Sequence, residues 1–201
     1  MRSCVRARGS SLDQAADQAA RTIANLPGSN IGAVTDTAPS TSAPTPTFRL
    51  WQKATRLPLG SRLFSAAVSL KAPYFRTALP HVVELRPGRC VVRGPGWWGN
   101  RNHIGTFHVI AACNLAEMAM GMLAEATVPA THRWIPVGMN VRYPAKSTGG
   151  MTVTAEWTDI PDFAAFTSGQ DVEVPLRFVD DAGVEPVVGT ITIRVSPKKK
   201  S

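Results

Sequence analysis

One carboxylate stands alone in the longest apolar segment of the chain. Glu117 is the only charged residue between Gly105 and Ala124, in a stretch dominated by Ala, Met and Leu. A carboxylate among apolar side chains costs free energy unless it is hydrogen-bonded or faces a cavity. A carboxylate in such a position is typical of a general base or a nucleophile. Glu117 is therefore the first catalytic candidate.

Polar residues gather just upstream of this segment. They are Asn102, His103, Gly105, Thr106 and His108. The segment near 105–127 is rich in good helix formers and Pro129 closes it, so these polar residues crowd the expected N-terminus of a helix. Free N–H groups and the helix dipole favour negative charge there. A carboxylate base and an N-terminal oxyanion site together make a minimal hydrolase.

Three of these residues carry a resemblance to a known family. Asn102, His108 and Glu117 follow one another at intervals of six and nine residues. In this pattern the chain resembles the hotdog-fold acyl-CoA thioesterases similar to the bacterial phenylacetate-pathway enzyme. The stretch 133–146 is similar to the strand after the helix in an uncharacterised branch of that superfamily. The resemblance covers roughly residues 48–195.

The resemblance implies a thioester hydrolase of fatty acid metabolism that cleaves an acyl-CoA substrate. Glu117 would act as general base or as nucleophile, and the two alternatives stay open. Asn102 and His108 would face Glu117 of the partner subunit, in a homodimer or a tetramer. Neither a metal nor another cofactor is implied. Arginine and lysine residues among the further candidates would pair with the phosphates of coenzyme A. The candidates for binding the substrate are Arg101, His103, Gly105, Thr106, Arg142 and Lys146.

One pair of residues departs from the family pattern. Val109 and Ile110 stand where the thioesterases have two glycines, and those glycines let a thioester come close to a backbone N–H. β-branched side chains obstruct that approach. A second hypothesis is therefore a non-catalytic acyl-CoA-binding or structural hotdog protein. A dehydratase of the same fold is a third hypothesis, which the spacing fits less well.

Each catalytic candidate also has a structural interpretation. Glu117 would be a buried carboxylate satisfied by Asn114, by a histidine or by a partner subunit. His108 would pack in the first helical turn, and Asn102 would cap the helix. The sequence leaves the catalytic and the structural interpretations open side by side.

The order of the expected elements gives the fold class without the motif. The helix at 105–127 is apolar on every side, which predicts that it is buried all round. Two short helices near 48–56 and 60–70 come before it. The strands expected on either side of it are 82–85 and 90–92, then 133–143, 151–157, 172–179 and 187–195. A sheet must wrap such a helix, so we expect an α+β hotdog fold, an antiparallel β-sheet around a long central helix.

Composition divides the chain into three parts. Residues 1–47 are rich in Ala, Ser, Thr and Pro and have almost no large apolar side chains, which predicts a disordered extension. Residues 48–197 form the expected hotdog thioesterase-like domain, with its short N-terminal helices over 48–72. Residues 198–201 form a basic tail. The chain of 201 residues is 44% hydrophobic, enough to bury one core without disulfides or metals.

The net charge of +8 does not indicate a nucleic-acid partner. Lys198, Lys199 and Lys200 supply three of the charges, and the other cations form no stripe with interleaved aromatic residues. Basic charge does suit a polyanionic ligand such as coenzyme A. No window of about 18 apolar residues is free of charge, so no membrane insertion is expected. Three unpaired cysteines and the lack of a secretory apolar segment predict a reducing, cytoplasmic location.

Overall fold

The computed structural model describes residues 44–199. Residues 1–43, on which most of the predicted disordered extension falls, lie outside the described part. The folded domain begins slightly earlier than expected, because helix α2 (Pro46–Ala54) starts before Phe48. Thr45 caps this helix by accepting the N–H of Phe48 at 3.2 Å, and its hydroxyl donates to the backbone carbonyl of Glu125 at 2.6 Å.

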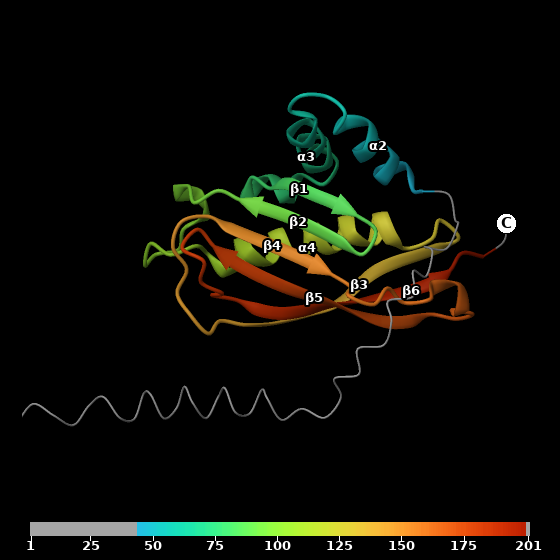
Figure 1. The fold of residues 1–201 in the computed structure, drawn as a ribbon. Helices are drawn as coiled ribbons and strands as arrows, with labels where there is room; N and C mark the ends of the chain where they lie inside the picture. The colour runs from blue at the N-terminus through green and yellow to red at the C-terminus, as the bar shows by residue number, and fades with distance from the viewer. Residues whose placement is uncertain (1–43, 200–201) are drawn as a thin grey trace, which may run out of the picture. The chain divides into compact units, whose positions relative to one another are not determined.

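The described residues form a six-stranded antiparallel sheet in the order β1-β2-β4-β5-β6-β3 (Figure 1). Its strands are β1 (His81–Arg86), β2 (Arg89–Gly94), β3 (His132–Arg142), β4 (Met151–Glu156), β5 (Gln170–Asp180) and β6 (Val188–Pro197). Every predicted strand is present, with ends within two residues of those expected. β3 lies at one edge and is joined to β2 through the long helix, so the chain crosses the sheet between them.

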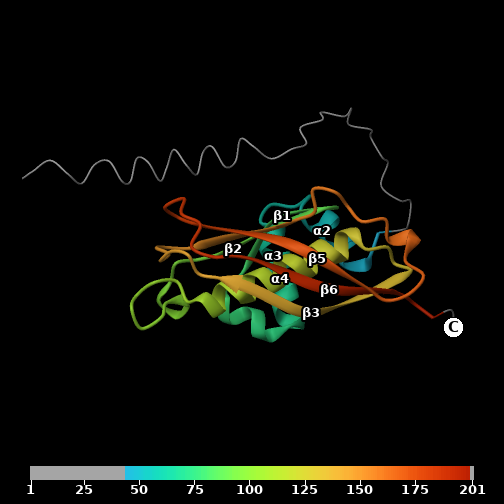
Figure 2. The ribbon, with the colours of Figure 1, turned by 90° about the horizontal axis from the view of Figure 1, so that it is seen from below.

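The long helix α4 (Val109–Thr127) packs along one face of the sheet (Figures 1 and 2). Leu115, Met118 and Leu123 are fully buried among the core side chains of the strands, such as Val92 and Val153. α4 is the one helix of residues 44–199 whose length and hydropathy would allow a membrane span. Its packing against the sheet makes it the core helix of the domain.

α4 is not buried on every side, which corrects the expectation from its composition. Ile110 is 51% exposed, Glu117 is also exposed, and Cys113 between them is half-buried. These positions lie three and four residues apart, so they form one stripe along the helix. The sheet covers the opposite side of α4, whereas among residues 44–199 this stripe is largely exposed. We call Ile110, Cys113 and Glu117 the α4 stripe.

The helices before the sheet pack on β1 and on α4. α3 (Gly60–Lys71) follows α2, and the 3-10 helix η1 (Pro73–Ala78) leads into β1. Trp51 of α2 and Phe64 of α3 are buried in an edge-to-face pair with ring centroids 5.1 Å apart. Figure 1 shows α3 and the α2–α3 loop standing above β1, outside the sheet.

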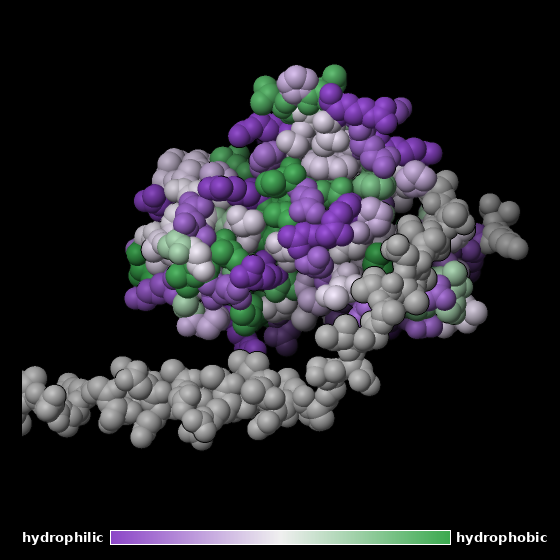
Figure 3. Space-filling view, viewed as in Figure 1, coloured by the Kyte–Doolittle hydropathy of each residue, from purple (hydrophilic) through white to green (hydrophobic). Residues whose placement is uncertain are grey.

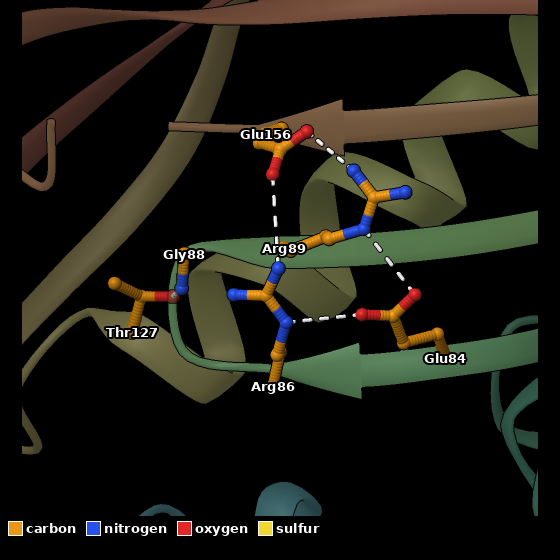
Figure 4. Close-up of polar contacts among 6 residues, drawn as sticks. All are labelled: Glu84, Arg86, Gly88, Arg89, Thr127 and Glu156. Atoms are coloured by element: carbon orange, nitrogen blue, oxygen red, sulfur yellow. Dashed lines mark hydrogen bonds and ion pairs between the residues drawn. The ribbon is translucent and has the colours of Figure 1, made fainter. Parts of the chain in front are cut away.

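Ion pairs and a hydrogen bond fix the β1–β2 hairpin beside the C-terminal end of α4 (Figure 4). Arg89 of β2 pairs with Glu84 of β1 at 3.2 Å and with Glu156 of β4. The N–H of Gly88, in the hairpin turn, donates to Thr127 Oγ1 at 2.9 Å. This hydrogen bond ties the last turn of α4 to the β1–β2 hairpin of the sheet.

Candidate functional site

The side chain of Asn102, together with backbone hydrogen bonds, holds the loop before α4 closed. Its Oδ1 accepts the N–H groups of Ile104 and Thr106, both at 3.1 Å. Its Nδ2 donates to Thr106 Oγ1 at 2.8 Å, and Gly105 takes the left-handed conformation that completes the turn (φ +80°). Asn102 therefore helps to close the loop. It does not cap α4, so the structural interpretation of Asn102 as a helix cap is wrong. His103, Ile104 and Gly105 lie exposed at the tip of this loop.

His108 is the residue that caps α4. Its backbone is extended, and its Nδ1 accepts the N–H of Ile110 at 3.1 Å. Helix α4 consequently begins at Val109, four residues later than expected. Because Nδ1 accepts this hydrogen bond, the proton of the neutral imidazole lies on Nε2, which is then a donor.

Backbone donors are free at this helix N-terminus. Within residues 44–199, neither Val109 N–H nor Ala111 N–H has a hydrogen-bond acceptor. Together with Nε2–H of His108 they make three donors at the end of the helix where the dipole favours negative charge. This arrangement can stabilise an oxyanion or bind an anionic group.

Two small cavities of about 190 Å³ each lie on either side of the first turn of α4. One, which we call the Lys146 cavity, is lined by Asn102, Thr106, Val109 and Lys146, together with other residues of the β3–β4 loop, of α4 and of the segment before β6. Three of the predicted site residues are therefore gathered here. The side chain of Val109 borders the cavity beside Asn102, where a glycine would leave room.

The second cavity, which we call the Asn114 cavity, is lined by His108, Ile110, Asn114 and Asn100, and by Tyr74 and Thr77 of η1. Asn114 donates from Nδ2 to the carbonyl of Tyr74 at 3.2 Å and to Thr77 Oγ1 at 3.3 Å. It therefore makes no hydrogen bond to Glu117, and the structural interpretation that paired these two residues is wrong.

Two buried amides were not foreseen as site residues. Asn100 is 1% exposed and Asn114 is 5% exposed, and among residues 44–199 the Oδ1 atom of each has no hydrogen-bond donor. A buried acceptor without a partner is costly, and it marks a place where a donor from water or a ligand binds. Asn114 carries a signal in the sequence, because Asn is unfavourable inside an apolar helix. Asn100 carries none.

Glu117 lines neither cavity. It lies nine residues after His108, which places it about 13 Å further along the helix axis. Its carboxylate cannot reach a group bound at the N-terminus of its own helix. The described chain thus brings Asn102 and His108 to one end of α4 and leaves Glu117 exposed on the α4 stripe.

The remaining predicted cations lie on the surface. Arg101 is exposed and donates from Nη2 to the carbonyl of Gly96 at 3.2 Å. Arg142 is exposed at the end of β3. Of the three cations proposed for coenzyme A, only Lys146 lines a cavity next to Asn102.

The cysteine on the α4 stripe is poorly suited to nucleophilic chemistry. Burial raises the pKa of the Cys113 thiol, so its reactive thiolate is scarce at neutral pH. Among residues 44–199, no three His, Cys, Asp or Glu side chains gather in a cluster that could hold a metal ion. The groups suited to chemistry here are therefore the donors at the start of α4 and the carboxylate of Glu117.

Comparison with known proteins identifies the family and the fold. A family model described as a domain of unknown function (DUF4442) matches residues 60–195. A crystal structure from structural genomics is 37% identical, with a TM-score of 0.65, and the match covers 76% of this chain and 99% of that one. No functionally curated protein matches the sequence.

Two more distant structures share the fold. A Pseudomonas aeruginosa protein described as a probable thioesterase is 22% identical, with a TM-score of 0.61 and coverage of 71% of this chain and 97% of that one. A Staphylococcus aureus thioesterase is 16% identical, with a TM-score of 0.54 and coverage of 62% and 99%. The chain therefore has the hotdog fold that its sequence predicts, an antiparallel sheet with the long helix α4 against it.

Proposed function

We propose that this chain, which belongs to the DUF4442 family, is a thioester hydrolase that acts on acyl-CoA as a homodimer or a dimer of dimers in the cytoplasm. The observation that carries the proposal is the separation along α4 of hydrogen-bond donors from the carboxylate. Three free donors lie at its N-terminus, beside Asn102, and the only carboxylate of its apolar segment is exposed on an uncovered stripe.

Two copies of α4 would bring these groups together. The α4 stripe is centred on Cys113, with Ile110 three residues before it and Glu117 four residues after it. If two stripes pack antiparallel across a two-fold axis near Cys113, Glu117 of the partner subunit lies beside His108 and Val109. Such an isologous contact uses one surface twice and completes two identical sites.

The proposed reaction follows from these positions. The thioester carbonyl oxygen accepts hydrogen bonds from Val109 N–H and from His108 Nε2–H. The carboxylate of Glu117 takes a proton from water, which attacks the carbonyl carbon, and the proton passes to the sulfur as the C–S bond breaks. The products are a carboxylic acid and free coenzyme A. Direct attack by the carboxylate, followed by hydrolysis of the anhydride, is the alternative route.

A separation of residues in a distant structural neighbour supports the assignment. Structures of the Staphylococcus aureus protein include variants in which a glutamine or a glutamate, 15 positions apart, is replaced by alanine. Asn102 and Glu117 have the same separation. Lys146, whose side chain borders the cavity beside Asn102, is the best placed cation for a phosphate of coenzyme A.

A non-catalytic acyl-CoA-binding protein is the second candidate function. Val109 favours it, because its side chain borders the Lys146 cavity and narrows the approach to the backbone donors. The two functions differ in one measurement, the release of free thiol from acyl-CoA.

Replacement of Glu117 by Gln tests the proposal. Gln keeps the size of the side chain but neither takes a proton nor attacks, so hydrolysis should fall about 10²–10⁴-fold. Thiol release is measured across acyl chain lengths, and the melting temperature on the same samples. The melting temperature should change little, because Glu117 is exposed and makes no ion pair among residues 44–199.

Glu125→Gln is the matched control, since it removes the other carboxylate of α4 and should leave the rate unchanged. Wild-type turnover in Glu117→Gln would remove the catalytic assignment. A wild-type chain that hydrolyses no acyl-CoA but is thermally stabilised by one would establish the binding protein instead.

A further inference from the structure

Helix α3 buries two serines beside Phe64 and turns two leucines outward. Its buried face includes Ser65 and Ser69, and Ser65 Oγ accepts the N–H of Val82 at 2.9 Å. Leu63 and Leu70 are 63% and 69% exposed. Packing within the domain therefore does not explain the leucines on this helix.

Three more exposed apolar residues flank these leucines in the sequence. Leu57 and Leu59 in the α2–α3 loop are 62% and 70% exposed, and Tyr74 is 69% exposed. Leu63 and Leu70 lie seven residues apart on α3, so these two side chains share one side of the helix. Single exposed apolar residues are ordinary, but a contiguous patch marks an interaction site. We call these five residues the α3 surface.

The charge around the α3 surface has one sign. Residues 44–80 contain no Asp or Glu. They contain six cations, all exposed: Arg49, Lys53, Arg56, Arg62, Lys71 and Arg76. Figure 3 shows apolar side chains at the top of the molecule, over α3 and the α2–α3 loop, next to strongly hydrophilic ones. A partner for this surface must offer both negative charge and a place for aliphatic side chains.

We propose that the α3 surface attaches the protein peripherally to an anionic lipid bilayer. Cations beside an exposed aliphatic stripe match the phosphate layer and the acyl layer of such a surface. The stripe stands on the outside of a helix and on a projecting loop, so it suits a fluid surface that adapts to it. Leu59, which adopts a left-handed backbone conformation (φ 60°), is the most exposed of the five residues.

A second copy of the chain fits this surface less well. A two-fold contact would place six cations against six more, and within residues 44–80 no carboxylate is present to pair with them. The proposed attachment is independent of thioester hydrolysis. It does bring the Asn114 cavity close to the bilayer, because Tyr74 belongs both to the α3 surface and to the cavity lining.

Cosedimentation of the full chain with vesicles tests the attachment. The chain should bind vesicles of equal parts phosphatidylglycerol and phosphatidylcholine, and added salt should weaken the binding. Pure phosphatidylcholine should bind at least about tenfold less. The double variant Leu63→Ser/Leu70→Ser should lose about tenfold or more of the binding to the anionic vesicles.

The control variant is Val184→Ser, which removes an apolar side chain 41% exposed in the β5–β6 turn and should bind like the wild type. The variant Arg56→Gln/Arg62→Gln keeps the leucines and should lose the preference for anionic vesicles. Equal binding by the wild type and by the leucine variant would overturn the proposal. So would a wild-type chain that stays in the supernatant. In that case, a lower mass of the leucine variant by light scattering would assign the surface to a second copy.

Discussion

His108 has a structural task that is measurable apart from a chemical one. It caps α4 through Nδ1, and this leaves its Nε2–H as a further donor at the start of the helix. His108→Ala removes both groups, so it should lower the free energy of unfolding by about 1 kcal/mol. It should also reduce thioester hydrolysis about 10²–10³-fold, as the loss of one oxyanion donor does. Urea unfolding and thiol release measure the two effects.

A serine at the same position separates the two tasks. Ser is a favoured N-cap, so His108→Ser should restore most of the stability that alanine loses. Its short side chain does not replace the imidazole donor, and the rate should stay as low as in His108→Ala. A serine variant with wild-type turnover would show that His108 serves only as the cap.

The intervals between Asn102, His108 and Glu117 could be read from the sequence, but the hydrogen bonds and the exposure of these residues could not. The hydrogen bonds of Asn102 within its own loop depend on the left-handed turn at Gly105, which sequence spacing does not specify. Asn100 and Asn114 are separated by 14 residues and meet only because α4 packs on η1. The residues of the candidate motif could thus be predicted from the sequence, but their positions in space and their hydrogen-bond partners could not.

The β5–β6 hairpin depends on one buried carboxylate, Asp180. It accepts the N–H groups of Ala182, Val184 and Thr148, each at 2.9 Å, and so joins the hairpin turn to the loop before β4. Burial alone would raise the pKa of Asp180, but these hydrogen bonds outweigh it and hold the pKa below its usual value. The charged form is therefore favoured in the folded state.

Asp180→Asn should destabilise the domain by about 1–3 kcal/mol at neutral pH, because one oxygen that accepts hydrogen bonds becomes a donor. A lowered pKa contributes stability above the unfolded value of about 3.9, and that contribution is lost as the pH falls through the folded pKa. The difference between wild type and variant should therefore shrink below about pH 4. Urea unfolding at a series of pH values measures it, and a difference independent of pH would contradict the role of the charge.

The order of the helices and strands followed from apolar periodicity and turn residues, but the coverage of each element did not. α4 is apolar all round, yet its stripe is uncovered, because a helix of any composition presents only one side to a sheet. In α3, too, residue type does not tell which side chains are buried, since Ser65 faces the core and Leu63 faces outward. Hydrophobicity predicts that a side chain will be covered and does not say by what.

Two features that are exposed within residues 44–199 are available to a second copy of the chain. β3 is an edge strand, paired on one side only, by β6, and it exposes Ile135, Val137 and Met139 at 60%, 52% and 38%. An open apolar edge strand invites pairing with another chain. Trp134 of β3 lies against Gly121 of α4, so this strand runs beside the helix that carries the α4 stripe. A second copy would cover both features at once.

Cys113 reports on this arrangement directly. An antiparallel contact of two α4 stripes that places Glu117 beside His108 of the partner subunit puts the two Cys113 side chains opposite each other at the axis. We expect a short bismaleimide to link them in a Cys4→Ser background, giving a dimer on a denaturing gel. Cys90 should not compete, because it is fully buried in the core, whereas Cys113 is only half-buried.

The link should disappear in Cys113→Ser, while light scattering of the uncrosslinked protein should still give a dimer or a tetramer. A chain that is monomeric at micromolar concentration would remove the shared-site mechanism. A dimer that forms no Cys113 link would keep the assembly but place its axis elsewhere. Glu117 of the partner subunit would then not be placed beside His108 and Val109 by this contact, and the proposed mechanism would lose its carboxylate.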